Sequence, residues 1–271
     1  HTALQLYTKP DTKPPWKLRE SADSESATGS DSSCFVGFDT SRYHEEKKGA
    51  SAYSAIVDAE GQVVHLGTDS FSGEKMTVKD IRKVIRNLVR DTHKKKGDDF
   101  KRLVIYRDGA DSHRESENWR KAILESGEGS RSIKKMIKDS DAYPDELTID
   151  LVYVNKSPSI RIFKKARNKA QNPDSGTYIE RDSETGWLNA TDVHYSSARP
   201  LEFQYKQRFT LGEADYDKPP VSQIMKEYHK QTVLNWATIY KKTKFALSQV
   251  LTQEIAKHAA KEQAPRNVLM I

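Results

Sequence analysis

The pattern of apolar and polar positions first predicts three β-strands. Short apolar runs occupy residues 34–39, 50–58 and 62–70, and polar residues separate them. Glu60-Gly61 supplies the turn between the second and third runs, because glycine adopts the backbone angles that a tight hairpin requires. The pattern therefore indicates an antiparallel, three-stranded opening.

A helical period replaces the strand pattern further along the chain. Across residues 78–95, Lys and Arg occupy one face and apolar residues recur on the other, at Val78, Ile81, Val84, Ile85, Leu88 and Val89. Residues 102–109 then form a short, continuous apolar run that ends in polar residues. Such a run is typical of a buried parallel strand that follows a helical crossover, so we expect Asp108 at its carboxyl end.

The later segments complete an α/β pattern. They predict a helix near 116–126, a strand at 147–154, a strand-rich stretch at 176–208 and helices near 221–240 and 244–262. Residues 19–33 are Ser-rich and acidic, which is typical of a linker. This order of elements is typical of a ribonuclease-H-like fold, which begins with three antiparallel strands and a helix and continues with parallel strands that alternate with helices. This is an α/β fold whose mixed central sheet is flanked by helices.

The composition excludes several classes of protein. The chain has 271 residues, and 45 Lys and Arg against 39 Asp and Glu give a formal net charge of +6. No apolar run approaches the roughly 20 residues that cross a bilayer, so we expect no membrane segment. The single cysteine, Cys34, excludes an intramolecular disulfide and a cysteine-based zinc site. We therefore expect a cytoplasmic protein.

Positive charge is concentrated in two segments. Residues 156–169 contain six Lys and Arg and no acid, and the last 54 residues contain nine Lys and Arg against three Glu. Such a cluster is either a solvated basic face or a surface for a phosphate backbone, since each neutralised phosphate releases counterions. The interleaved Ser, Tyr and Asn donors favour nucleic acid.

Two carboxylates follow the strands that we expect to be central and adjacent. Asp39 comes directly after the first apolar run, and Asp108 ends the run at 102–109. A pair at this position can hold two divalent cations roughly 4 Å apart for phosphodiester cleavage. Hard oxygen ligands suit Mg²⁺ or Mn²⁺. For either aspartate alone, a capping or turn role is the simpler interpretation.

Several short motifs together resemble the PIWI domain of Argonaute proteins, most of all the long prokaryotic Argonautes. They are VGFDTSR at 36–42, SGEK at 72–75, YRDG at 106–109, VNKSPSIRIF at 154–163 and SSARP at 196–200. In addition, LQLYTKPDTKPPWKL at 4–18 is similar to the segment that ends their MID domain. The resemblance assigns residues 1–33 to a C-terminal remnant of the MID domain and linker, and residues 34–271 to the PIWI domain.

The resemblance implies a metal-dependent endonuclease that cuts a nucleic-acid strand paired to a short bound guide. Asp39 and Asp108 match the two aspartates of the family's catalytic tetrad, which holds two Mg²⁺ or Mn²⁺ ions. Glu74 matches the mobile glutamate that completes the site, and a glutamate on a Gly-containing loop can swing inward. Alternatively, Glu74 favours the N-terminus of the following helix.

The fourth tetrad position departs from the family pattern, in which it is usually Asp or His and opens the final helix. The register that we favour places Gln253 there. The neutral carbonyl of Gln253 is a poorer metal ligand than a carboxylate. Three interpretations stay open: the activity is weakened, Glu254 or His258 takes the place of the missing ligand, or another register applies. The alternative function is therefore a PIWI domain that binds guide and target without cutting. Another ribonuclease-H-like nuclease and an unrelated basic α/β domain also stay open.

Further positions match the family's contacts with the guide. Lys156 and Arg161 match basic residues that touch guide phosphates, and Arg199 matches the arginine of the family's S-R-P-like motif, which also binds nucleic acid. The carboxylate of Ile271 matches a terminus that helps to ligate a metal near the 5' phosphate; alternatively, this tail only completes the core. The implied partners are a short 5'-phosphorylated guide, a complementary target strand and the N, PAZ and MID domains. Defence against invading DNA is the implied biological role.

Overall fold

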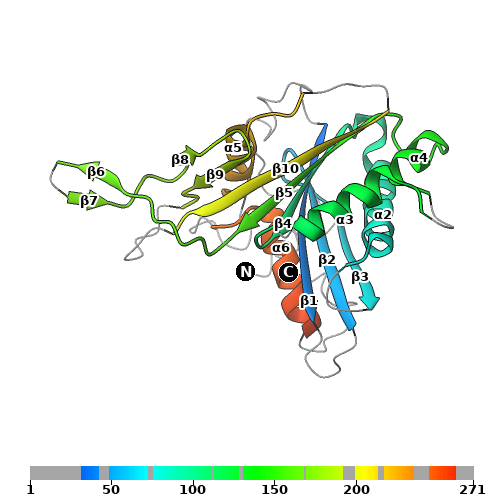
Figure 1. Ribbon diagram of the computed structural model, residues 1–271, viewed down its shortest axis with the longest axis horizontal. Coiled ribbons are helices and arrows are strands. Elements are labelled where there is room, and N and C mark those ends of the chain that lie inside the picture. The colour runs from blue at the N-terminus through cyan, green and yellow to red at the C-terminus, as the bar shows by residue number, and fades with distance from the viewer. Residues whose placement is uncertain are drawn as a thin grey trace.

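An eight-stranded mixed sheet forms the centre of the molecule (Figure 1). The computed structural model describes residues 32–42, 49–72, 76–111, 113–127, 131–167, 169–191, 199–212, 217–234 and 244–260. The strand order across the sheet is β3-β2-β1-β4-β5-β10-β9-β8. Of the predicted MID remnant and linker at residues 1–33, residues 1–31 lie outside the described residues, and Ser33 already begins the first strand.

The strands of the main sheet have the following bounds. They are β1 (Ser33–Arg42), β2 (Gly49–Asp58), β3 (Val63–Ser72), β4 (Arg102–Asp108), β5 (Leu147–Asn155), β8 (Tyr178–Glu180), β9 (Thr185–Leu188) and β10 (Leu201–Leu211). β1, β2 and β3 pair antiparallel, β4 is parallel to both β1 and β5, and β10 is antiparallel to β5. The predicted antiparallel opening and the parallel strand after the crossover are both confirmed.

Helices cover both faces of this sheet. They are α2 (Val78–Lys96), α3 (His113–Leu124), α4 (Ile133–Lys138), α5 (Val221–Thr232) and α6 (Leu247–Ala260), with a 3-10 turn at η1 (Gly97–Asp99). α2 begins with a capping box, in which Thr77 and Asp80 satisfy each other's backbone N–H groups. No helix in the described part of the chain is both long enough and apolar enough to span a membrane.

Side-chain alternation along the strands divides the core into two layers. Val36 and Phe38 of β1 pack with α2, α3 and α4, whereas Phe35 packs with α5 and α6. Figure 1 shows α2, α3 and α4 gathered at one end of the molecule and α6 alongside β1. A strand that is buried on both faces reads as a continuous apolar run, which is why β1, β4 and β5 are recognisable in the sequence.

A separate hairpin projects beyond the main sheet (Figure 1). It consists of β6 (Lys164–Ala166) and β7 (Lys169–Gln171), and Arg167 in its turn has a positive φ of 51°. The sequence analysis did not predict these strands, because they lie in a basic stretch and have no apolar face to produce a period of two. Phe163, just before the hairpin, is 55% exposed.

Candidate functional site

The parallel pairing of β1 and β4 brings Asp39 and Asp108 together. Phe38 lies opposite Arg107 in the register, so the two aspartates are the next residues on neighbouring strands. Neighbouring strands are about 4.8 Å apart. Asp39 shares a strand face with Phe35 and Gly37, and Asp108 shares one with Val104 and Tyr106. Both carboxylates therefore point to the face of the sheet that carries α5 and α6.

The environment of Asp39 disfavours its negative charge. Burial raises the pKa of Asp39, and the adjacent charge of Asp108 raises it further. The opposing contributions are smaller and include the backbone N–H of Thr40, which donates to Asp39 Oδ1 at 2.7 Å. The pair is therefore a concentrated negative charge that positive charge stabilises.

Lys156 supplies positive charge at this point. It follows β5 directly, and its ammonium forms an ion pair with Asp108 Oδ2, with both side chains about one-fifth exposed. The same ammonium lies 4.9 Å from the centroid of the Phe245 ring, which is cation–π distance. Lys156 therefore bridges the carboxylate pair and the segment that leads into α6.

Arg107 fixes the ends of both strands from the opposite face of the sheet. Its Nε donates to Glu115 Oε1 of α3 at 2.8 Å, and its Nη2 donates to Thr40 Oγ1 at 3.1 Å. Its Nη1 donates to the main-chain oxygen of Asp108 at 2.9 Å. No local pattern in the sequence marks a role for this arginine of the YRDG motif, because two of its partners, Glu115 and Thr40, lie on other elements.

α6 lies directly on the backbone of β1. A Cβ at Gly37 would lie 2.2 Å from the carbonyl oxygen of Ser248, so only glycine permits this approach. Thr252 Oγ1 donates to the carbonyl oxygen of Gly37 at 2.9 Å. The contact positions α6 against the strand segment that ends in Asp39.

The structure places Gln253 in the second turn of α6 rather than at its start, since the helix begins at Leu247. Gln253 is half-buried, and no hydrogen bond joins it to Asp39 or Asp108 among the described residues. Glu254 is also half-buried, whereas the side chain of His258 lies outside the described part. The first turn contains Ser248 and Gln249, both buried, and no acid.

Two more cations lie close to Lys156. Lys244 Nζ donates to the main-chain oxygen of Lys156 at 3.3 Å. Burial lowers the pKa of Lys244, and the positive charges of Arg199 and Lys156 lower it further. Arg161 is exposed, in the segment that leads toward β6. The sequence analysis assigned no role to Lys244, because its partners are distant in the sequence.

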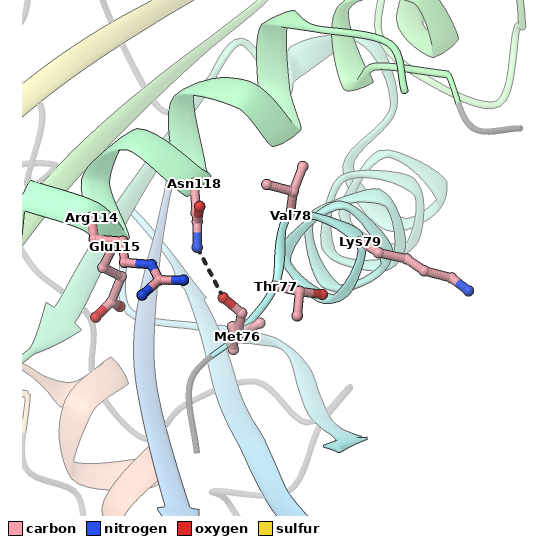
Figure 2. A pocket seen from close by; sticks show the side chains of 7 residues that line it. All are labelled: Met76, Thr77, Val78, Lys79, Arg114, Glu115 and Asn118. Atoms are coloured by element: carbon pink, nitrogen blue, oxygen red, sulfur yellow. Dashed lines mark hydrogen bonds between the residues drawn. The ribbon is translucent and has the colours of Figure 1, made fainter. Parts of the chain in front are cut away.

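A pocket of about 530 Å³ opens between the N-terminal ends of α2 and α3 (Figure 2). It is lined by Met76, Thr77, Val78, Lys79, Arg114, Glu115 and Asn118. Asn118 Nδ2 donates to the main-chain oxygen of Met76 at 3.3 Å, which joins the two helix ends.

Two of the predicted site residues, Glu74 and Ile271, lie outside the described residues.

The donor chemistry of the carboxylate pair fits a hard divalent cation. No group of three or more His, Cys, Asp or Glu gathers among the residues that the structure describes. Asp39 and Asp108 nevertheless present carboxylate oxygens side by side, and these are the ligands that Mg²⁺ and Mn²⁺ prefer. Within the described part, the pair therefore offers two carboxylates of the kind that an oxygen-ligand metal site uses.

Comparison with known proteins identifies a family and a fold. The family model for the Piwi domain matches residues 3–200. No curated protein matches the chain in sequence. Among solved structures, Clostridium butyricum Argonaute bound to a guide DNA and a 19-mer target DNA is similar over 97% of this chain, with 18% identity and a TM-score of 0.67.

Two further structures give the same result. Marinitoga piezophila Argonaute, in complex with a 5' OH guide RNA and target DNA, is similar over 83% of this chain, with 18% identity and a TM-score of 0.55. Aquifex aeolicus Argonaute is similar over 90%, with 21% identity and a TM-score of 0.56. The chain covers 30% of each of the three proteins. The predicted ribonuclease-H-like α/β fold is thereby confirmed.

Proposed function

Because the chain belongs to the Piwi domain family, we propose that it is the catalytic part of a guide-directed, divalent-metal-dependent endonuclease. Its substrate is a single nucleic-acid strand paired to a short bound guide. One observation carries this proposal. The β1–β4 pairing sets Asp39 and Asp108 side by side, on the face of the sheet where Lys156 and Lys244 also gather.

Asp39 and Asp108 hold the metal ions in this proposal, with Glu74 and the carbonyl of Gln253 as further ligands. When bound, two Mg²⁺ or Mn²⁺ ions activate a water and stabilise the leaving oxygen of the phosphodiester. Arg107 keeps the ends of β1 and β4 in place, so the spacing of the carboxylates is set before substrate arrives. The chain's own contribution is this rigid arrangement of charge.

Lys156, Arg161, Arg199 and Lys244 bind the phosphate backbone in the same proposal. Lysine and arginine contacts to phosphates position a strand and read no sequence. Pairing with the guide then selects the target, a division of labour that other guided nucleases use. The guide and target strands in the Clostridium butyricum and Marinitoga piezophila structures support this assignment of partners. Four further expectations stay predictions: the metal site at Ile271, the presence of N, PAZ and MID domains in the parent chain, the cytoplasmic location and the role in defence.

A second candidate function is guided binding without cleavage. It is favoured by α6, whose opening residues Leu247, Ser248 and Gln249 include no acid, and by the neutral side chain at Gln253. Such a protein finds targets with the same basic surface but holds its metal ions less tightly.

Cleavage by the intact protein distinguishes the two functions. The protein is loaded with a 5'-phosphorylated guide and a labelled complementary strand in Mn²⁺ or Mg²⁺, beside Asp108→Ala and the surface control Asp91→Ala on α2. We expect one guide-dependent and metal-dependent cut in the wild type and in Asp91→Ala. Asp108→Ala should reduce the rate at least a hundredfold, as expected for the loss of a metal ligand. Tight guided binding with no cut by any of the three proteins would establish the second function.

A further inference from the structure

We propose that Lys156 is a displaceable counter-ion that excludes divalent metal from the Asp39–Asp108 pair until a nucleic-acid strand draws it away. This inference rests on the proposed function, because it concerns the regulation of the same metal site. The structure shows the first of the two positions of Lys156, in which its ammonium is paired with Asp108 Oδ2.

The ammonium and a metal ion compete for the same carboxylate oxygen. Mg²⁺ binds a carboxylate oxygen at about 2.0–2.1 Å, whereas Lys156 Nζ already lies within hydrogen-bond distance of Asp108 Oδ2. Two cations on one oxygen repel each other strongly at this separation. Arg107 is no such competitor, since its guanidinium contacts the main-chain oxygen of Asp108 and the carboxylate of Glu115. Metal entry at Asp108 Oδ2 therefore requires Lys156 to leave.

Lys156 has a second binding partner within reach when a strand is present. Its ammonium lies against the Phe245 ring, and Lys244 Nζ donates to its main-chain oxygen at 3.3 Å. Two neighbouring lysines attract a phosphate, and an arriving phosphate offers Lys156 a replacement for Asp108. The residue lies in a bend just after β5 rather than within a strand. Its long side chain has several rotatable bonds and is about one-fifth exposed, so its ammonium can turn from Asp108 toward a phosphate.

The consequence is a coupling between strand binding and metal binding. Without a strand, Lys156 neutralises Asp108 and weakens metal affinity. With a strand, the carboxylate pair is released and metal affinity rises, and the reverse coupling must be equally large. Such coupling confines metal loading to the protein that holds its substrate.

Mn²⁺ binding by the intact protein tests the proposal independently of cleavage. Free Mn²⁺ is measured by electron paramagnetic resonance in titrations of the wild type, Lys156→Met and Lys218→Met. Lys218 is a matched control, because it also pairs with a carboxylate, Glu184, at 2.6 Å and lies 4.6 Å from the centroid of an aromatic ring, that of Tyr205.

We expect Lys156→Met to bind Mn²⁺ on the order of tenfold more tightly than the wild type, because one nearby positive charge is removed. Lys218→Met should match the wild type. Addition of guide and a non-cleavable target should tighten binding in the wild type toward that of strand-free Lys156→Met, and should have little effect in the variant.

Equal Mn²⁺ affinity in the strand-free wild type and Lys156→Met would overturn the proposal while leaving the metal site intact. No binding by any protein, with or without strands, would overturn the metal site as well. Metal-free thermal unfolding and circular dichroism establish that the variants are folded.

Discussion

Asp39 is a residue whose negative charge is unfavourable for folding, although the proposed metal site requires that charge. Its pKa is raised by burial first and by Asp108 second. For an acid with a raised folded-state pKa, the ionised form costs folding free energy at every pH above the unfolded value, and the cost disappears as the pH falls. Stability and function therefore oppose each other at this position.

We expect Asp39→Asn to raise the thermal unfolding temperature of the metal-free protein at neutral pH. The amide oxygen still accepts from the Thr40 N–H, while the repulsion from Asp108 is removed. The difference from the wild type should shrink as the pH is lowered through the range where Asp39 binds a proton. Differential scanning calorimetry across this pH range checks the prediction. As a control, added Mn²⁺ should raise the unfolding temperature of the wild type but not that of Asp39→Asn. A lower unfolding temperature for the metal-free variant at neutral pH would contradict it.

Single residues were predictable where a local pattern marks them. Asp39 and Asp108 each end an apolar run, so the sequence analysis placed both at strand ends, and the parallel register places them side by side. Lys244 and Arg107 carry no such mark. Their roles depend on contacts between segments far apart in the sequence, which a period of two or 3.6 does not encode.

At the scale of elements, the contact between α6 and β1 sets the geometry beside the carboxylates. A Cβ at position 37 would meet the main chain of Ser248, whereas a Cβ at Gly67 would meet the side chains of Ser54 and His65. Main chain moves only with its whole helix, but side chains can rotate away.

Gly37→Ala should therefore destabilise the protein by about 1–3 kcal/mol, the range for overpacking a core. Gly67→Ala is the matched control, because both glycines lie in strands and neither has a positive φ. It should lower the free energy of unfolding by less than Gly37→Ala, because the new Cβ meets side chains that can rotate away. Chemical denaturation gives both free energies of unfolding. An equal cost for the two substitutions would show that α6 is not held against β1 as described.

Elements were predictable in proportion to how much apolar surface they bury. β1, β4, β5 and α2 have strong patterns and lie where they were expected. The short helix α4 and the hairpin β6–β7 were missed, because one has only two buried residues and the other belongs to an exposed basic stretch. The predicted helix at 221–240 is seen as α5, which ends at Thr232; residues 235–243 lie outside the described part.

At the scale of the whole molecule, a buried ion cluster joins β4, β5, β10 and α5. Arg102 is fully buried and donates to Asp150 at 2.8 Å and to both carboxylate oxygens of Glu227 at 2.8 and 3.0 Å. Arg208 also donates to Asp150. Burial raises the pKa of Asp150, but Arg102 and Arg208 outweigh this effect and lower it. The cluster thereby ties β4, the strand that carries Asp108, to β5, β10 and α5.

Arg102→Met should destabilise the protein by about 3–5 kcal/mol, because it leaves the buried carboxylate of Glu227 without its arginine and Asp150 with Arg208 alone. Arg82→Met is the control, since Arg82 is also buried but donates to main-chain oxygens of Ala122 and Glu125. Its cost should be about 1–3 kcal/mol.

The lowered pKa of Asp150 also gives a pH dependence. Its pairs stabilise the fold above the unfolded pKa, and this contribution is lost as the pH falls through the folded pKa. Urea denaturation over acidic pH should show a shallower loss of stability in Arg102→Met than in the wild type.

The hydrogen-bonded pairing of β1 with β4 also limits which sequence changes this chain can accept during evolution. The spacing of Asp39 and Asp108 is determined by main-chain hydrogen bonds, so one apolar residue can replace another along these strands without moving the carboxylates. A single-residue deletion within β4 is different, because it would turn Asp108 to the opposite face of the sheet. The strands that carry the site should therefore accept many substitutions and reject changes in length, which is consistent with a shared fold at 18% identity.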